Sequence, residues 1–209
     1  MRLLLIDTCG ETGSVALADG ATVVALENLP PRAASSALLA GIRALLERAG
    51  WQRESLEGIG VVSGPGSFTG VRVGLAAAKG LCEARGLPLA AVSRLEVLAD
   101  VAALTRGFAV LNAGRGEVYV RGTAVMAQGR ELLIDAEGLL AITQGERVVI
   151  AEECLLTMLE TVHPELHTLN AASALPAILR SLEEGGVDPA VVDANYVRSE
   201  ENIYGKVKA

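Results

Sequence analysis

The glycine-rich segment at residues 64–74, Gly-Pro-Gly-Ser-Phe-Thr-Gly-Val-Arg-Val-Gly, has residue types that can hold an anion. It falls between a predicted strand and a predicted helix, where backbone N–H groups and the helix dipole favour negative charge. Its spacing matches neither the Walker phosphate loop, nor the dinucleotide fingerprint, nor the nucleophile elbow. Spacing alone therefore favours a tight strand-to-helix turn, with anion binding as the alternative. The loop residues concerned are Gly64, Gly66, Ser67, Phe68, Thr69 and Gly70.

A second candidate lies at residues 7–14, where the first predicted strand turns into the next. The aspartate of such a hairpin can hold a hydrated Mg²⁺ beside nucleotide phosphates. This gives a candidate cofactor-binding set of Asp7, Thr8, Gly13 and Ser14. The alternative is a hairpin turn whose polar side chains bond backbone amides. In the second half of the chain, Asn112 follows the first predicted strand as Asp7 does in the first half. An amide is a poorer cation ligand than a carboxylate and cannot act as a base, so catalysis at a site between the two halves is predicted to be weakened.

The histidines and cysteines give weaker signals. His163 and His167 are four residues apart, as in some zinc sites, but Pro164 pushes His163 out of helical geometry. We therefore expect exposed loop histidines. The three cysteines at positions 9, 82 and 154 are widely spaced and are predicted to be buried free thiols. The sequence predicts no catalytic residue and no metal ligand.

Hydrophobic patterning predicts the elements that position these residues. A type I′ turn at Asp19-Gly20 should join the second and third strands, and Ser93 with Glu96 should form a helix capping box. The first half is predicted to contain strands at 3–6, 14–18, 22–26, 58–63 and 87–92 and helices at 36–49, 71–85 and 95–104. The second half is predicted to contain strands at 108–111, 118–125, 131–134 and 147–151 and helices at 136–142, 153–160 and 172–184.

The first half has the order βββαβαβα and the second half repeats it in weaker form, so the two halves share a βββαβα unit, which indicates an internal duplication. The predicted fold class is α/β with mixed sheets, in a two-lobed actin-like (ASKHA) architecture like that of ATPases and sugar kinases. Residues 1–104 form the predicted N-terminal lobe, and residues 105–209 form a degenerate C-terminal lobe with a polar tail. In such sheets ligands collect in the crevice at the strand ends.

Small residues on the helix at 71–85 suggest a close helix contact. Gly74 and Ala78 lie one turn apart, and an interior glycine costs a helix about 1 kcal/mol relative to alanine. We expect this helix and the helix at 36–49 to pair with a second subunit, with packing inside the lobe as the alternative. The predicted interface residues are Leu38, Leu39, Ile42, Leu45, Leu46, Val71, Gly74, Leu75 and Ala78.

Composition restricts the possible partners. The 209-residue chain has a formal charge of −7 and 3% aromatic residues, so unaided binding to nucleic acid is disfavoured. We found no apolar run near the ~20 residues that a bilayer span needs. The apolar run at residues 3–6 ends at Asp7, too early for a secretory signal, so a cytoplasmic location without membrane contact is expected.

Four segments resemble the bacterial TsaB family, also called YeaZ, in the right order over almost the whole chain. They are Leu5-Ile6-Asp7-Thr8, the glycine-rich segment 64–74, Gly116-Glu117-Val118-Tyr119 and Asn195-Tyr196-Val197-Arg198. The resemblance implies the actin-like fold and a non-catalytic subunit that pairs with TsaD. In that family TsaD carries the metal and transfers threonylcarbamoyl to N6 of the tRNA adenosine beside the anticodon.

The resemblance also implies the ATPase TsaE as a partner, contact with tRNA through the complex, and a homodimer in isolation. No cofactor is expected to bind this chain tightly, and ATP or ADP is expected to bind only to the assembled complex. The chain departs from the family at three places. It has Ala34-Ser35-Ser36 where the family often has His-Ser-Glu, Asn112-Ala113-Gly114-Arg115 where the family often has Asp-Ala-Arg, and Ala194 where the family usually has proline. These changes affect polar roles rather than the fold.

Two enzyme classes are the alternatives. A small actin-like ATPase or kinase is opposed by Asn112 and by the absence of lysine from the glycine-rich segment. A glycoprotease-type peptidase is opposed because neither metal ligands nor a nucleophile triad can be assembled from the sequence.

Overall fold

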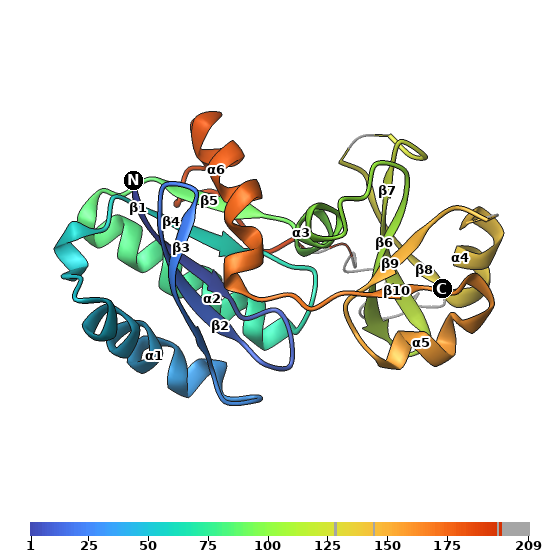
Figure 1. The fold of residues 1–209 in the computed structure, drawn as a ribbon, viewed down its shortest axis with the longest axis horizontal. Helices are drawn as coiled ribbons and strands as arrows, with labels where there is room; N and C mark the ends of the chain where they lie inside the picture. The colour runs from blue at the N-terminus through green and yellow to red at the C-terminus, as the bar shows by residue number, and fades with distance from the viewer. Residues whose placement is uncertain (128, 144, 196, 198–209) are drawn as a thin grey trace, which may run out of the picture.

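The computed structural model describes residues 1–127, 129–143, 145–195 and 197, which form two lobes built on two five-stranded sheets (Figure 1). The first sheet has the order β3-β2-β1-β4-β5, and β1 pairs antiparallel with β2 and parallel with β4. Because β1 lies in the middle of this sheet, its residues 3–6 are fully buried, which explains their continuous apolar run. The strands are β1 (Arg2–Asp7), β2 (Ser14–Asp19), β3 (Thr22–Asn28), β4 (Gly58–Val62) and β5 (Leu89–Val92).

The second sheet repeats this topology, with the order β10-β9-β6-β7-β8. Its central strand β6 pairs antiparallel with β7 and parallel with β9, as β1 does with β2 and β4. The predicted α/β class with duplicated mixed sheets is confirmed. The strands are β6 (Gly107–Gly114), β7 (Glu117–Thr123), β8 (Glu131–Asp135), β9 (Val148–Ile150) and β10 (Glu165–Leu166). The short exposed β10 has no apolar pattern that could have predicted it.

The helices also follow the prediction, apart from their ends. Helix α2 begins at Phe68 because the Ser67 hydroxyl accepts a hydrogen bond from the backbone N–H of Gly70 at 3.2 Å. Phe68, Thr69 and Gly70, predicted as loop residues, therefore form the first turn of α2. The helices are α1 (Ala34–Ala49), α2 (Phe68–Arg85), α3 (Arg94–Val101), α4 (Ala136–Thr143), α5 (Cys154–Met158) and α6 (Leu175–Glu183). Short 3-10 turns are η1 (Arg53–Ser55), η2 (Glu160–Val162) and η3 (Ala171–Ala174).

The lobes exchange helices, which the predicted boundary near residue 104 does not allow for. Helix α6, assigned to the second lobe, packs on the first sheet, where Ile178 covers Gly60 of β4. Helix α3, assigned to the first lobe, packs Leu95 and Leu98 against β6 and β9 of the second sheet. In Figure 1, α6 crosses one face of the first sheet while α1 and α2 lie on the other. Hydrophobic periodicity predicts which face of a helix is buried, but not against which sheet.

Two local predictions are wrong. In the β2–β3 hairpin Asp19 pairs with Thr22, so the turn residues are Gly20 and Ala21 rather than Asp19 and Gly20. Ser93 caps α3, but its hydroxyl accepts from the Leu95 N–H at 3.2 Å and the capping box with Glu96 does not form; the Glu96 carboxylate accepts a hydrogen bond from Arg180 at 3.0 Å. Within the described ranges, no helix is both long and apolar enough to span a membrane. Tyr196, Arg198 and the polar tail after Ser199 lie outside the described residues.

Candidate functional site

A cavity of about 580 Å³ lies where the β1–β2 loop, the starts of α1, α2 and α3, and the second lobe meet. Each lobe contributes, because Asn112 and Glu152 come from the second sheet region and the other lining residues come from the first lobe and α3. This is the crevice at strand ends in which ligands of α/β folds collect. The lining residues are Thr8, Cys9, Gly10, Glu11, Arg32, Ala34, Ser35, Gly66, Ser67, Thr69, Gly70, Arg94, Asn112 and Glu152.

The predicted phosphate hairpin uses its polar groups within the protein. The Asp7 side chain is buried and accepts a hydrogen bond from the Cys9 N–H at 2.9 Å. The Thr8 hydroxyl donates to the Gly70 carbonyl at 2.6 Å, and the Ser14 hydroxyl accepts from the Ala171 N–H at 2.8 Å. Of Asp7, Thr8, Gly13 and Ser14, only Thr8 lines the cavity. These bonds are those of a hairpin turn whose polar side chains bond backbone groups, which was the alternative to phosphate binding.

The glycines of the 64–74 segment let α2 lie directly against the β1–β2 loop. A Cβ at Gly66 would overlap with the Cys9 carbonyl, and a Cβ at Gly70 would overlap with the Thr8 carbonyl. The Ser67 N–H donates to the Cys9 carbonyl at 2.8 Å, which fixes the two backbones together. These contacts account for the glycines through close backbone approach.

Arg94 occupies the inner wall of the cavity and was not predicted from the sequence. Its side chain is 9% exposed and binds the Glu152 carboxylate at 2.7 Å, and its Nε lacks an acceptor among the described residues. Burial by itself lowers the pKa of Arg94, but the charges of Glu152 and Asp7 outweigh burial and hold that pKa above its ordinary value. One signal in the sequence could have indicated this role. A cation in the first turn opposes the helix dipole, so it needs a partner outside the helix.

Asn112 completes the second-lobe side of the cavity. Its amide Nδ2 donates to the Cys154 sulfur at 3.3 Å, and its Oδ1 accepts from the Gly114 N–H at 2.8 Å. The Asn112 backbone N–H donates to Glu152 at 3.1 Å. The side chain is thus held by its own strand and by α5. The acid expected at this place in an active two-lobed kinase is replaced by an amide with structural partners.

The predicted interface residues divide into a buried group and one exposed residue. Gly74 and Ala78 face the lobe itself, since a Cβ at Gly74 would overlap with the Thr8 hydroxyl and Ala78 has no exposed surface. The prediction that they form a partner surface is wrong, because the small residues let α2 approach β1. Leu39 is 67% exposed. The other buried members are Leu38, Ile42, Leu45, Leu46, Val71 and Leu75.

The outward face of α2 carries a different set of small side chains. Ala76, Gly80 and Ala84 are exposed, and Val73 and Ala77 are half-buried. These positions recur at helical spacing, so they form one stripe. Beside α1 lies a largely apolar groove of about 540 Å³, whose lining includes Leu39, Trp51 and Leu81.

The candidate metal ligands do not come together. His163 is exposed, as predicted, whereas His167 is half-buried with its Nε2 3.8 Å from Glu165. In the parts of the chain that the structure describes, no group of three or more His, Cys, Asp or Glu side chains could hold a metal ion.

The thiols should separate by reactivity. Cys9 and Cys82 are buried as predicted, but Cys154 is exposed. Burial, with the Asp7 charge, raises the pKa of Cys9 well above its ordinary value, and burial raises the pKa of Cys82 to about 11.

Because the thiolate is the reactive form, Ellman's reagent at pH 8 should modify Cys154 alone in the folded protein and all three cysteines after unfolding. Cys154→Ser should abolish the native reaction, and rapid modification of Cys9 or Cys82 in the folded state would contradict this expectation.

Comparison with known proteins agrees with the geometry. The sequence model of the family described as "TsaD: tRNA N6-adenosine threonylcarbamoyltransferase" matches residues 29–149. The tRNA threonylcarbamoyladenosine biosynthesis protein TsaB of Escherichia coli is 39% identical over 123 residues, which are 57% of this chain and 53% of that protein. The chain thus spans about half the length of the curated relatives it matches.

Solved structures extend the similarity to nearly the whole chain. YeaZ from Pseudomonas aeruginosa has a TM-score of 0.78 and 25% identity, covering 93% of this chain and 99% of that one. Component A of (R)-2-hydroxyglutaryl-CoA dehydratase from Acidaminococcus fermentans has a TM-score of 0.57 and 12% identity, covering 88% and 98%, and shares the fold alone. These similarities confirm the resemblance to TsaB and YeaZ and the actin-like (ASKHA) fold.

Proposed function

The chain belongs to the family described as TsaD, tRNA N6-adenosine threonylcarbamoyltransferase, and from this membership we propose that it is a non-catalytic subunit in the synthesis of threonylcarbamoyladenosine in tRNA. It pairs with the catalytic TsaD subunit of the same cell and activates it. Support comes from the curated relative named as a biosynthesis protein of this modification. The observation that carries the non-catalytic role is the buried Arg94–Glu152 ion pair in the cavity between the lobes.

This ion pair lies in the cleft where an actin-like enzyme would bind its nucleotide. The Arg94 guanidinium donates a hydrogen bond to Glu152, and the buried Asp7 carboxylate accepts one from the Cys9 N–H. A nucleotide with Mg²⁺ would need free carboxylates for the cation and free donors for the phosphates. Asn112 supplies neither a charge nor a base. The cleft therefore serves to hold the two lobes together rather than to turn over a substrate.

We propose that TsaD binds on the outer side of α1 and α2. Leu39 exposes 67% of its surface there, next to the apolar groove that reaches Trp51 and Leu81. The stripe of Ala76, Gly80 and Ala84 lets a facing helix come close to the α2 backbone. An exposed leucine beside a groove lined by half-buried apolar side chains is typical of a protein contact.

Leu39→Glu tests this function directly. It should leave the fold intact, because the side chain is in solvent, but weaken binding to the same organism's TsaD by roughly tenfold or more, or about 1.4 kcal/mol. Copurification and tRNA modification by the reconstituted subunits measure the effect. The matched control is Leu156→Glu, which places the same change at a leucine 40% exposed in the second lobe. Full activation by Leu39→Glu, or loss with Leu156→Glu instead, would move the partner surface elsewhere. Failure of the unaltered chain to activate TsaD would refute the proposed function.

The isolated chain should not hydrolyse ATP. Asp7 is buried and bonded to backbone, Asn112 is held by Cys154 and Gly114, and Arg94 is paired with Glu152, so these three residues are not arranged to bind Mg²⁺·ATP. Phosphate release from purified protein with Mg²⁺·ATP should equal the buffer background. Steady hydrolysis that Asp7→Ala abolishes in a folded variant would support an actin-like ATPase instead.

The remaining assignments follow from the same proposal. TsaE is the ATPase partner, and ATP or ADP binds at the level of the complex rather than tightly to this chain. Because the net charge of −7 repels the phosphate backbone, the other subunits contact the tRNA. The chain forms a homodimer when isolated. The complex works in the cytoplasm, where its tRNA substrate is found.

A further inference from the structure

Two consecutive residues at the start of α3 each bind a carboxylate of the second lobe. The Ser93 hydroxyl donates to Glu131 of β8, and Arg94 binds Glu152, which follows β9, at 2.7 Å. Both contacts lie inside the protein, since the side chains of Glu131 and Arg94 are 8% and 9% exposed. This segment connects β5 to α3, and it is also held by the first lobe, because the Arg94 N–H donates to the Gly64 carbonyl at 2.7 Å. Ser93 and Arg94 therefore join the first lobe to the second sheet.

Glu131 binds further segments with the same carboxylate. It accepts hydrogen bonds from Arg121 of β7 at 3.2 Å and from the Asn195 amide at 2.7 Å. Asn195 in turn donates its backbone N–H to the Ser63 carbonyl, which follows β4 of the first sheet, at 2.8 Å. Asn195 therefore joins the first lobe, through Ser63, to Glu131 of the second lobe.

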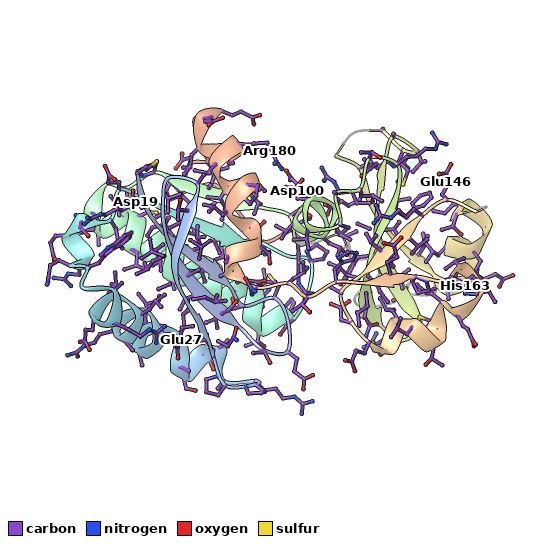
Figure 2. The ribbon with its side chains drawn as sticks, in the orientation of Figure 1. Asp19, Glu27, Asp100, Glu146, His163 and Arg180 are labelled. Atoms are coloured by element: carbon purple, nitrogen blue, oxygen red, sulfur yellow. The ribbon has the colours of Figure 1, made fainter. Side chains whose placement is uncertain are left out.

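A third contact joins the two exchanged helices. Arg180 of α6 binds Asp100 at 2.6 Å and Glu96 at 3.0 Å, both on α3 (Figure 2). Because α6 packs on the first sheet and α3 on the second, this contact also crosses between the lobes. In Figure 2, Arg180 and Asp100 lie at the junction of the lobes.

We propose that α3 is an interlobe lock, in which Ser93–Glu131–Asn195, Arg94–Glu152 and Arg180–Asp100 hold the lobes at one fixed angle without a ligand. Two-lobed enzymes commonly close around their ligands by hinge motion. Here the bonds that a ligand would make across the cleft are made by the protein's own side chains. The lock concerns this chain alone, so its test is separate from that of the partner assignment.

Distances between paired spin labels measure the lobe angle. The labels are placed at Ala44→Cys on α1 and Thr157→Cys on α5, both exposed, in a Cys154→Ser background. The protein with the lock intact should give one narrow distance distribution, unchanged by Mg²⁺·ATP. The variants Glu131→Ala and Ser93→Ala/Arg94→Met/Glu152→Leu/Asn195→Ala/Arg180→Ala should broaden it, because the second variant removes a side chain from every contact of the lock. The matched control is Glu165→Ala, which breaks an ion pair with Arg147 inside the second lobe and should leave the distribution narrow.

Two results would overturn the lock. One is a narrow distribution in the folded lock variants, as judged by circular dichroism. The other is a shift of the unaltered distribution on adding Mg²⁺·ATP, which would mean that a ligand sets the angle. The five-residue variant removes every contact of the lock, leaves Glu131 bonded to Arg121, and removes the buried charges of Arg94 and Glu152 together. This variant therefore decides the question even if Glu131→Ala does not fold.

Discussion

Gly70→Ala is expected to destabilise the protein by about 1–3 kcal/mol, whereas Gly80→Ala in the same helix should stabilise it by about 0.5–1 kcal/mol. A Cβ at Gly70 would overlap with the Thr8 backbone carbonyl, while a Cβ at Gly80 meets nothing within 4 Å. The backbone of β1 is fixed by strands on both sides, so it cannot move away cheaply. Urea unfolding of the two variants and the parent measures both free energies.

Gly74→Leu extends this comparison to the residue first predicted to face a partner. Its side chain would enter the space of Thr8 and Ile6, so loss of stability is expected rather than a folded monomer. Gly80→Ala serves as the control for stability because it changes the same helix where a Cβ meets nothing within 4 Å in this chain. Equal stabilities of Gly70→Ala and the parent would mean that α2 does not lie against the β1–β2 loop as described.

Glu152→Leu should destabilise the protein by about 3 kcal/mol, because it leaves a buried guanidinium without its counter-charge. Arg94 is 9% exposed and Glu152 is 25% exposed, so the cost falls at the lower end of the range for buried pairs. The double variant Arg94→Met/Glu152→Leu should recover most of the loss, since it removes both charges. Thermal or urea unfolding of the single and double variants measures this coupling.

Glu146→Leu is the matched control for that experiment. Glu146 pairs with Arg106, which is 61% exposed, so solvent replaces the lost partner and little change is expected. Equal effects of Glu146→Leu and Glu152→Leu would show that the Arg94–Glu152 pair is not buried in solution. Failure of the double variant to recover stability would mean that Glu152 acts mainly through the Asn112 N–H.

Local patterns in the sequence were enough to predict the helices, their order and every strand except β10. The apolar run at residues 3–6 predicted the central buried strand, and the βββαβα order in each half predicted the duplicated sheets. The glycine-rich segment carried the resemblance that the relatives confirm. These features are local, because period, turn residues and motif spacing act over a few neighbouring residues.

Contacts between residues far apart in the sequence could be found only from the packing of the elements. The small residues Gly74 and Ala78 indicate a close approach, but only the packing shows that Gly74 lies against the side chains of Thr8 and Ile6 rather than against a partner. Arg94 and Glu152 are 58 residues apart, and no local pattern links them. Helix faces, buried ion pairs and exchanged helices depend on which surfaces are brought together in space. A one-dimensional pattern reports that a face is buried, and the fold alone decides what buries it.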